Sequence, residues 1–225
     1  MSETDNLRTS KFLIVLISFI GLTFFVHGGI TNNVDNLITK IFYNIGGLHN
    51  TIDVIVIIIS SLGDLFVMLI VGLILTIIRR TRRIGLLVLI SIVILSVSTM
   101  YIKPLVGRPA PLEQYVPKFH VPDKYTIEKD SMMPISRDLS FPSNHAARAA
   151  AFIIILGFWS NVQGKRNIVG RILWIFPLAI GFTRLYLLQN YLFDVVGGLL
   201  YGIIVGLVLC RLIKLNRMSE MNKFN

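Results

Sequence analysis

The composition of this chain places it among the membrane proteins. The chain has 225 residues, of which 54% are hydrophobic and 15% are charged, and its mean hydropathy is +0.71. Soluble domains usually carry about a quarter charged residues. The composition therefore excludes an ordinary soluble domain and predicts a single polytopic membrane domain over residues 1–225. The one cysteine, Cys210, excludes an intramolecular disulfide.

Several apolar segments are long enough to form helices that cross a bilayer. A hydrocarbon core of about 30 Å requires roughly 20 helical residues. The segments lie near residues 12–29, 54–78, 84–102, 143–160, 172–188 and 191–210. They predict an all-α bundle of six transmembrane helices. The residues after the first segment, His27-Gly28-Gly29, lack a convincing cleavage pattern, so we expect a retained anchor and not a signal peptide.

The net charge of +10 is distributed unevenly between the two sides of this predicted bundle. One side holds the N-terminus, the loop 79–83, the loop 161–171 and the C-terminal tail, with 13 of the 22 basic and three of the 12 acidic residues. The positive-inside rule assigns this side to the cytoplasm. We therefore interpret the arginines of the loop 79–83 as a topology determinant and not as a nucleic-acid site. Both termini are expected to be cytoplasmic, in a plasma membrane of bacterial type.

Two segments on the outer side have recognisable patterns. Residues 34–45 have apolar side chains at the spacing of an amphipathic helix that lies in the membrane interface. The polar stretch 104–142 contains seven of the eight prolines and cannot form a regular helix throughout. We expect it to be an outer loop that caps a site, and a simple connector is the alternative.

Small residues and one acid stand out within the apolar segments. Glycines recur at every fourth position of the last segment, at Gly198, Gly202 and Gly206, and they predict close helix packing in lipid. Asp64 lies within the apolar segment 54–78, which makes a functional role a hypothesis. If a helix begins at Ser60-Ser61, however, Asp64 lies in its first turn and favours the helix dipole. We favour this structural interpretation.

Three polar segments emerge on the predicted outer face, and their residues suit phosphate chemistry. They are Lys103–Pro109, Phe141–His145 and Thr183–Asp194. Phosphate ester cleavage requires cations, an in-line nucleophile and an acid for the leaving oxygen. Residues of the required kinds are the cations Lys103, Arg108 and Arg184, the helix-start residues Ser143 and Asn144, and the acid His145. No metal ion or other cofactor is expected, because too few carboxylates and histidines occur together.

The three segments resemble the motifs of the type 2 phosphatidic acid phosphatase family, the PAP2 superfamily of lipid phosphate phosphatases related to vanadium haloperoxidases. The family motifs are Lys, six residues and Arg-Pro; then Pro-Ser-Gly-His; then Ser-Arg, five residues, His, three residues and Asp. They occur here in this order, and the six-helix layout covers nearly the whole chain. The resemblance implies a membrane protein that acts on, or binds, a lipid phosphate or diphosphate in the outer leaflet.

The resemblance also implies roles for individual residues. Matching positions are Lys103 in the first motif, Pro142, Ser143 and His145 in the second, and Arg184 and Asp194 in the third. In the family, the second-motif histidine is the general acid. The third-motif aspartate orients a histidine that attacks phosphorus and forms a phosphohistidine. The general acid is thus expected to be His145, and the orienting carboxylate Asp194.

Some positions depart from the family pattern. The expected arginine is Ala110, the glycine is Asn144, the serine is Thr183 and the nucleophilic histidine is Asn190. An amide nitrogen cannot form a phosphoenzyme, because its lone pair is delocalised. Asn190 and Asp194 are four residues apart, so we expect Asp194 to accept an N–H from this amide. Arg108 or Arg148 could replace the arginine missing at position 110, although Arg148 could instead snorkel to the interface.

These departures leave the enzymatic activity open. We expect a PAP2-like protein with lost or impaired hydrolysis that binds a lipid headgroup or a partner protein. The alternative is an active phosphatase with unorthodox residues, acting on phosphatidate, phosphatidylglycerol phosphate or an isoprenoid diphosphate such as undecaprenyl diphosphate. Other outer histidines, His27, His49 and His120, have no adjacent acid in the sequence. A transporter is less expected, because the polar site is at one face and no internal repeat is visible.

Overall fold

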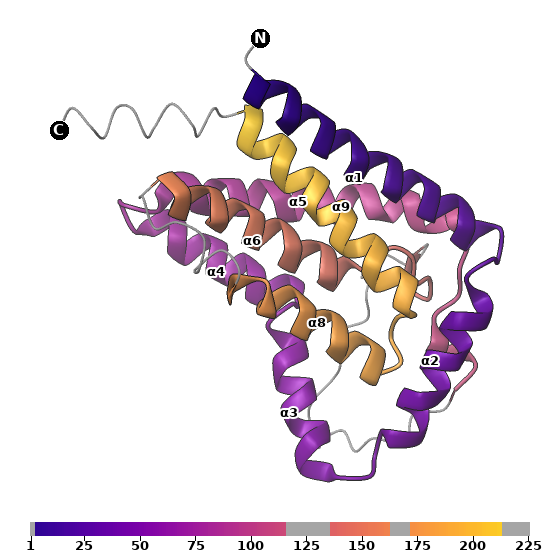
Figure 1. Cartoon of the computed structure of the whole chain (residues 1–225). Helices are drawn as coiled ribbons and strands as arrows, with labels where there is room; N and C mark the ends of the chain where they lie inside the picture. Colours follow the sequence, from indigo (N-terminus) through magenta and orange to yellow (C-terminus); the bar gives the residue numbers. More distant parts are fainter. Residues whose placement is uncertain (1–2, 116–135, 163–171, 213–225) are drawn as a thin grey trace, which may run out of the picture.

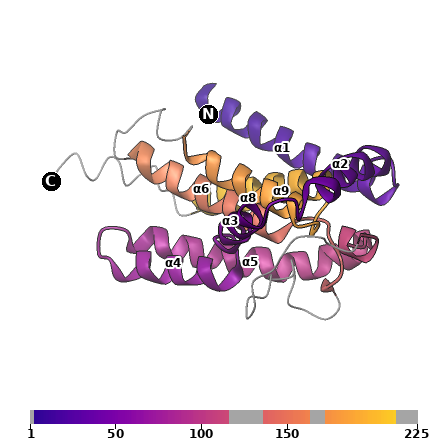
Figure 2. The same ribbon diagram turned by 90° about the horizontal axis from the view of Figure 1, so that it is seen from below.

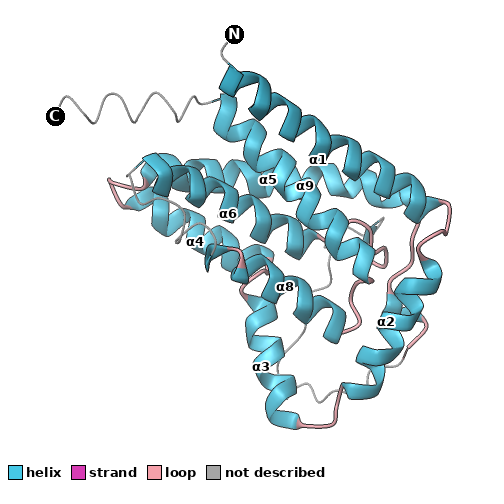
Figure 3. Cartoon of the chain, viewed as in Figure 1, coloured by secondary structure: helices cyan, strands magenta, loops and turns pink. Residues whose placement is uncertain are grey.

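The chain folds into helices joined mostly by short turns. The computed structural model describes residues 3–115, 136–162 and 172–212. Within these ranges the structure has helices and one isolated antiparallel bridge, Pro109 to Leu139, and no strand (Figure 3). The helices are α1 (Glu3–His27), α2 (Asn32–Ile45), α3 (Asn50–Ser61), α4 (Leu65–Ile77), α5 (Arg82–Val106), α6 (Asn144–Val162), α8 (Ile175–Tyr186) and α9 (Leu192–Leu212), with a short 3-10 helix η1 (Pro111–Glu113). The all-α prediction is confirmed.

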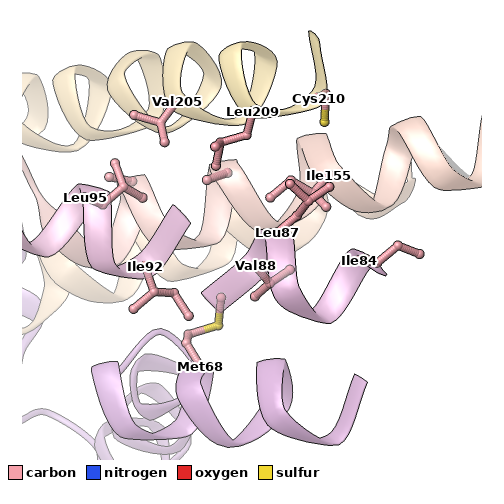
Figure 4. Packing of buried hydrophobic residues seen from close by; sticks show 12 residues of the cluster. Met68, Ile84, Leu87, Val88, Ile92, Leu95, Ile155, Val205, Leu209 and Cys210 are labelled. Atoms are coloured by element: carbon pink, nitrogen blue, oxygen red, sulfur yellow. The ribbon is translucent and has the colours of Figure 1, made fainter. Parts of the chain in front are cut away.

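Helix α6 lies at the centre of the bundle, where it contacts α5, α8 and α9. Helices α4 and α5 form a hairpin on one side of α6, and α1 packs against α9 on the other side (Figure 2). Apolar side chains from α4, α5, α6 and α9 fill the space between these helices (Figure 4). The surrounding acyl chains are as apolar as these side chains, so the hydrophobic effect does not drive the helices together in lipid. Close packing between the helices stabilises the bundle instead.

Glycines bring α6 and α9 into close contact. A Cβ added at Gly198 would collide with the carbonyl oxygen of Ser143, and one added at Gly202 would collide with that of Ala147. The backbone of α9 therefore lies directly on the start of α6. The predicted packing role of these glycines is confirmed, and it places the first turns of α6 and α9 side by side.

The predicted single helix over 54–78 is wrong. The chain forms α3 and α4 instead, which meet at 51° across a break of a few residues. Gly63 lies in the break, and Asp64 has the extended backbone of the residue before α4. A Cβ added at Gly63 would lie 2.9 Å from Ile180 and 3.2 Å from the His145 ring, so a larger residue does not fit without movement. The break therefore packs directly against the start of α6.

The described residues contain three helices that are long and apolar enough to cross a bilayer: residues Ser10–His27 of α1, α5 and α9. The bent pair of α3 and α4 meets the same criterion when taken together, and the apolar helices Asn144–Trp159 and Ile175–Tyr186 are shorter. The expectation of six transmembrane helices is therefore not confirmed. The apolar helices, with many large apolar side chains exposed on their outer surfaces, are those of a multi-pass membrane protein.

The two ends of the bundle differ. The start of α1, the end of α9 and the turn between α4 and α5 lie toward one end (Figure 1). Helix α2 and the starts of α6 and α9 lie toward the other end. The predicted amphipathic helix is confirmed as α2, and it ends before Gly46 as expected. Its apolar residues Val34, Leu37 and Ile41 are exposed, whereas Asp35 and Thr39 are buried, so its polar side faces the protein.

The predicted outer loop 104–142 is described only at its two ends. Residues 104–106 belong to the last turn of α5, and residues 116–135 lie outside the described residues. The two ends pair with each other, because the Ala110 N–H donates to the Asp138 carbonyl and the Ser140 N–H donates to the Arg108 carbonyl, each at 2.9 Å. This pairing holds Arg108 beside the segment that leads into α6.

Candidate functional site

The three motif segments meet at one backbone carbonyl. Lys103 Nζ lies 2.7 Å from the Leu139 carbonyl oxygen and 3.3 Å from that of Ser140, and it donates to both. The Asn190 amide nitrogen donates to the same Ser140 carbonyl at 3.0 Å. Residues from the first and third motifs are therefore joined through the residue that precedes the second motif. Lys103 and Asn190 are both buried.

The side chain of Asn190 is held at both ends. Its carbonyl oxygen accepts a hydrogen bond from Ser143 Oγ at 3.1 Å and one from Arg184 Nε at 3.4 Å. The amide nitrogen is occupied by Ser140, as described above. Arg184 is fully buried, and its NH1 also lies 3.4 Å from Ser60 Oγ in the last turn of α3. At the position expected for the nucleophile there is thus an amide, which contacts two of the predicted phosphate-binding residues, Ser143 and Arg184.

Asp194 does not bond to Asn190, contrary to the expectation from their spacing. One of its carboxylate oxygens accepts from Arg108 NH1 at 2.9 Å, and the other accepts from the Tyr191 N–H at 2.7 Å. A fully buried carboxylate requires such partners, because an unpaired charge is costly away from water. A guanidinium supplies a stronger partner than an amide.

Arg108 joins Asp194 to a second buried carboxylate that sequence reasoning missed. Its NH2 lies 2.6 Å from Asp35 Oδ2, and the other oxygen of Asp35 accepts from the Phe193 N–H at 3.1 Å. The guanidinium also lies 4.1 Å above the Tyr191 ring. Burial raises the pKa of the Tyr191 phenol to about 12. These contacts fasten α2 to the start of α9. The predicted amphipathic pattern of α2 contained the signal, since Asp35 lies on its polar side.

His145 has a carboxylate partner, and this partner is Asp64. The imidazole Nε2 lies 2.9 Å from Asp64 Oδ1, whereas Asp64 makes no side-chain cap on α4. Asp64 lies at the N-cap of α4, where an acid favours the helix dipole as expected, but its carboxylate also contacts His145, so its surroundings are not structural alone. The other ring nitrogen, Nδ1, lies 3.4 Å from Arg148 NH2. Arg148 is buried and points toward His145, so it does not snorkel to the interface.

The remaining predicted positions lie as follows. Asn144 begins α6, and its carbonyl accepts from Arg148 Nε at 3.2 Å. The Thr183 hydroxyl donates to the Ile180 carbonyl within α8 at 2.7 Å. His27 Nδ1 lies 3.2 Å from the Val106 carbonyl oxygen, and His49 is exposed at the start of α3. His120 lies outside the described residues.

The network has a small excess of positive charge. Its buried cations are Lys103, Arg108, Arg148 and Arg184, and its carboxylates are those of Asp35, Asp64 and Asp194. An excess of buried cations attracts an anionic group. Within the described ranges, no three histidine, cysteine or acidic side chains lie together as metal ligands do. The arrangement suits an anion with several oxygens, and the one buried imidazole among the described residues is that of His145.

Comparison with known proteins identifies the family. The family model described as the PAP2 superfamily matches residues 84–218, which is more than half of the chain. The chain belongs to the PAP2 superfamily. The match begins in α5 and contains all three motif segments. The identification agrees with the resemblance of those segments to the family motifs, and the protein is a lipid phosphate phosphatase-like membrane protein.

The chain is similar over part of its length to a bacterial diphosphatase. The undecaprenyl-diphosphatase BcrC of Bacillus subtilis (strain 168) is 35% identical over 81 residues, which cover 36% of this chain and 39% of that protein. This chain therefore matches about two-fifths of the length of BcrC.

Solved structures show the same fold over most of the chain. A transmembrane PAP2 type phosphatidylglycerolphosphate phosphatase from Bacillus subtilis has a TM-score of 0.70 at 21% identity, covering 91% of this chain and 96% of its own. Aquifex aeolicus LpxE has a TM-score of 0.57 at 21% identity, covering 79% and 95%. At these identities the likeness establishes the fold alone.

Proposed function

We propose that this protein binds lipids with a phosphate or diphosphate headgroup at the outer face of the plasma membrane, and that it has lost the phosphohistidine route of hydrolysis. The observation that carries the proposal is Asn190, an amide at the nucleophile position within an otherwise cationic site. Membership of the PAP2 superfamily supports lipid phosphates as the ligand class. The similarity to BcrC supports isoprenoid diphosphates in particular.

The cations around Asn190 are the ligand contacts. Lys103 and Arg184 bind phosphoryl oxygens, and Arg148 takes the place of the arginine missing at position 110. The first turn of α6, with Ser143 and Asn144, adds its hydroxyl and the favourable end of a helix dipole. Arg108 reaches a headgroup only when it exchanges one of its two carboxylate partners, because Asp35 and Asp194 engage both sides of its guanidinium.

Hydrolysis by the family route stops at its first step. A phosphoenzyme requires a nitrogen lone pair that attacks phosphorus, and the amide nitrogen of Asn190 has none available. Its N–H is already donated to Ser140, and its oxygen accepts from Ser143 and Arg184. The headgroup therefore stays bound without passing to a covalent intermediate. A transporter has less support, because the polar network lies near the starts of α6 and α9 and not halfway along the bundle.

The charge distribution supports the proposed side of the membrane. The start of α1 and the end of α9 adjoin two of the basic segments. Both lie at the opposite end of the bundle from the starts of α6 and α9, beside which the Asn190 network lies (Figure 1). The positive-inside rule assigns that basic end to the cytoplasm. The headgroup site then faces the outer leaflet, with α2 in the interface beside it.

The test is a lipid-binding measurement on the purified full-length protein. Thermal unfolding in detergent is followed with phosphatidate against diacylglycerol, and with undecaprenyl diphosphate against undecaprenol. A ligand that binds only the folded state raises the midpoint in a saturable way. We expect this rise with the phosphorylated lipids and none with their neutral counterparts.

Matched variants locate the binding. Arg148→Gln is expected to weaken the stabilisation by phosphorylated lipids. Arg211→Gln, which removes an exposed arginine at the far end of α9, is expected to leave it unchanged. Equal stabilisation by neutral and phosphorylated lipids would contradict the proposal, and so would equal responses of the two variants.

A further inference from the structure

The turn between α4 and α5 carries four arginines within residues 79–83, at the opposite end of the bundle from the starts of α6 and α9 (Figure 1). We infer that this arginine turn binds a phospholipid whose headgroup carries two phosphodiester groups, such as diphosphatidylglycerol, in the leaflet at that end of the bundle. This lipid site is separate from the headgroup site around Asn190 and independent of the function proposed there. The four side chains are all exposed: Arg79, Arg80, Arg82 and Arg83.

The charges of the arginine turn are not neutralised by the protein around it. None of the four guanidiniums forms an ion pair with a carboxylate that the structure describes. Helix α4 ends here with the negative pole of its dipole and α5 begins here with the positive pole of its own, so the two poles offset each other. The positive charges of the arginines therefore remain, and they attract an anion from outside the described part of the chain.

The backbone of the arginine turn is held in one shape. The Thr81 hydroxyl donates to the Leu75 carbonyl at 2.8 Å, and Arg82 Nε donates to the Thr76 carbonyl at 3.3 Å. These bonds satisfy two carbonyls at the end of α4 that have no partner within the helix. A Cβ added at Gly85 would collide with the Thr76 backbone nitrogen, so α4 and α5 meet closely at this end. Arginines on such a fixed turn lose less conformational freedom when they bind a ligand.

Most of the hydrogen-bond donors on the arginine turn are open to a ligand. Arg82 uses its Nε for Thr76, and the side chains of the other three arginines make no hydrogen bond with any residue that the structure describes. A guanidinium has five N–H donors and binds two oxygens of one phosphate group in a fork. Each phosphodiester offers two free oxygens and one negative charge. Four guanidiniums therefore suit a headgroup with two phosphodiesters better than a headgroup with one.

Large apolar side chains lie directly beside the arginines. Ile77 and Ile78, which precede Arg79, are exposed, and so is Leu86 in α5. Arginines at the end of an apolar helix place their charged groups at the level of the lipid headgroups. A phospholipid matches both parts of this surface, because its phosphates reach the arginines while its acyl chains cover the apolar side chains. An acidic protein segment would match the charge alone.

A role as a topology determinant does not account for this arrangement. The positive-inside rule depends on how many basic residues lie on one side of the membrane, and it needs no fixed geometry. Here the hydrogen bonds of Thr81 and Arg82 fix the turn, and the close contact at Gly85 holds the two helices that carry it. The arrangement is that of a surface prepared for a ligand.

The experiment counts the lipids bound to the purified full-length protein by native mass spectrometry. Diphosphatidylglycerol, phosphatidylglycerol and phosphatidylcholine are titrated separately. We expect one diphosphatidylglycerol per chain at the arginine turn, binding of phosphatidylglycerol that is about tenfold or more weaker, and no saturable binding of phosphatidylcholine. The double variant Arg79→Gln, Arg80→Gln is expected to bind diphosphatidylglycerol about 25-fold more weakly, about fivefold for each arginine. Replacing the same two arginines by lysine should keep part of the affinity, because the charge stays while the fork is lost.

Control variants separate this site from general attraction and from the site around Asn190. Lys11→Gln with Arg211→Gln removes the same charge from exposed positions near the start of α1 and the end of α9, and should leave the binding unchanged. Arg148→Gln should also leave it unchanged. Thermal unfolding without lipid checks that each variant is folded, and the lysine variant decides if the glutamine variant is not.

Several results would overturn the inference. Equal losses in the two double glutamine variants would mean that the lipid responds only to net charge. Equal affinities for diphosphatidylglycerol and phosphatidylglycerol would contradict recognition of two phosphates. A loss with Arg148→Gln and none at the arginine turn would place the lipid at the other end of the bundle. Saturable binding of a polyglutamate peptide without binding of any lipid would identify an acidic protein as the partner.

Discussion

Two aspartates beside the site have opposite surroundings. Asp64, before α4, lies 2.9 Å from the imidazole of His145. Asp194, in the first turn of α9, lies 2.9 Å from the guanidinium of Arg108, and its carboxylate is bonded to Arg108 and the Tyr191 N–H in place of residue 190. The family pattern places an imidazole next to the second acid. In this chain the oriented histidine is therefore found at the second motif and absent from the third.

The difference shows what holds the site together with an amide at position 190. Asp194 remains buried because Arg108 and the Tyr191 N–H neutralise it and satisfy its oxygens. Asp35 extends the same network to α2. Removing one member of such a buried network would leave an uncompensated charge, which is costly whether or not catalysis occurs. The contacts of Asp194 and Asp35 therefore do not depend on the side chain at position 190.

The largest expected effect comes from restoring the imidazole at position 190. Asn190→His supplies a nitrogen lone pair at the nucleophile position, and we expect phosphate release from lipid phosphates to rise by at least about 100-fold. The measurement is steady-state phosphate release with purified protein. Adding Ala110→Arg should raise the rate further. Asn190→Ala is the control and should give no gain, and an equal gain in both variants would show that release of the Ser140 contact is responsible.

A large loss of stability is expected when the guanidinium between the two carboxylates is removed. Arg108→Gln leaves Asp35 and Asp194 buried without their cation, and we expect a cost of about 3–5 kcal/mol. Denaturant unfolding in detergent measures this difference. The double variant with Asp35→Asn should recover part of the stability, because one uncompensated charge is gone. No recovery would mean that Arg108 acts mainly through its packing on Tyr191.

A smaller effect on stability is expected where α9 packs closely against α6. Gly202→Ala places a methyl group against the Ala147 carbonyl, and we expect a loss of about 1–3 kcal/mol. Gly157→Ala is the matched control, because nothing lies within 4 Å of its added Cβ. It should be neutral or stabilising by up to about 1 kcal/mol. Equal effects at both positions would contradict the close approach of the helices.

The smallest expected effect concerns Asp53, a buried aspartate in the first turn of α3. Tyr186→Phe removes the hydroxyl that donates to Asp53 at 2.5 Å but leaves the donation from the Gly47 N–H. We expect a cost of about 1–3 kcal/mol in unfolding experiments and no change in lipid binding. A change in lipid binding would indicate that α3 and α8 transmit strain to the site.

Much of the fold was predictable from the sequence, because apolar length and small-residue spacing report directly on helices in lipid. The amphipathic helix α2 and the glycines at 198 and 202 follow from periodicity alone. The break at Gly63 was missed, since apolar residues continue on both sides of it. Its signal was Gly63-Asp64 itself, a flexible residue followed by an acid within an apolar run.

The site was predictable in part. Motif spacing indicated that Lys103, Ser143, Arg184 and Asn190 belong together, and they are joined by hydrogen bonds in the structure. The carboxylates Asp35, which pairs with Arg108, and Asp64, which pairs with His145, were not predictable, because neither belongs to a motif. Which carboxylate reaches which cation depends on the bend between α3 and α4 and on the packing of α2. Sequence spacing carries no information about either.

The most direct test of the central assignment is a search for a covalent phosphoenzyme. Wild-type protein and Asn190→His are incubated with a lipid diphosphate labelled at the terminal phosphorus, quenched under alkaline conditions that preserve phosphohistidine, and mapped by mass spectrometry. The loss of the covalent route predicts no labelled residue in the wild type and a label at position 190 in the variant. A phosphohistidine on the wild-type protein, at any position, would contradict it.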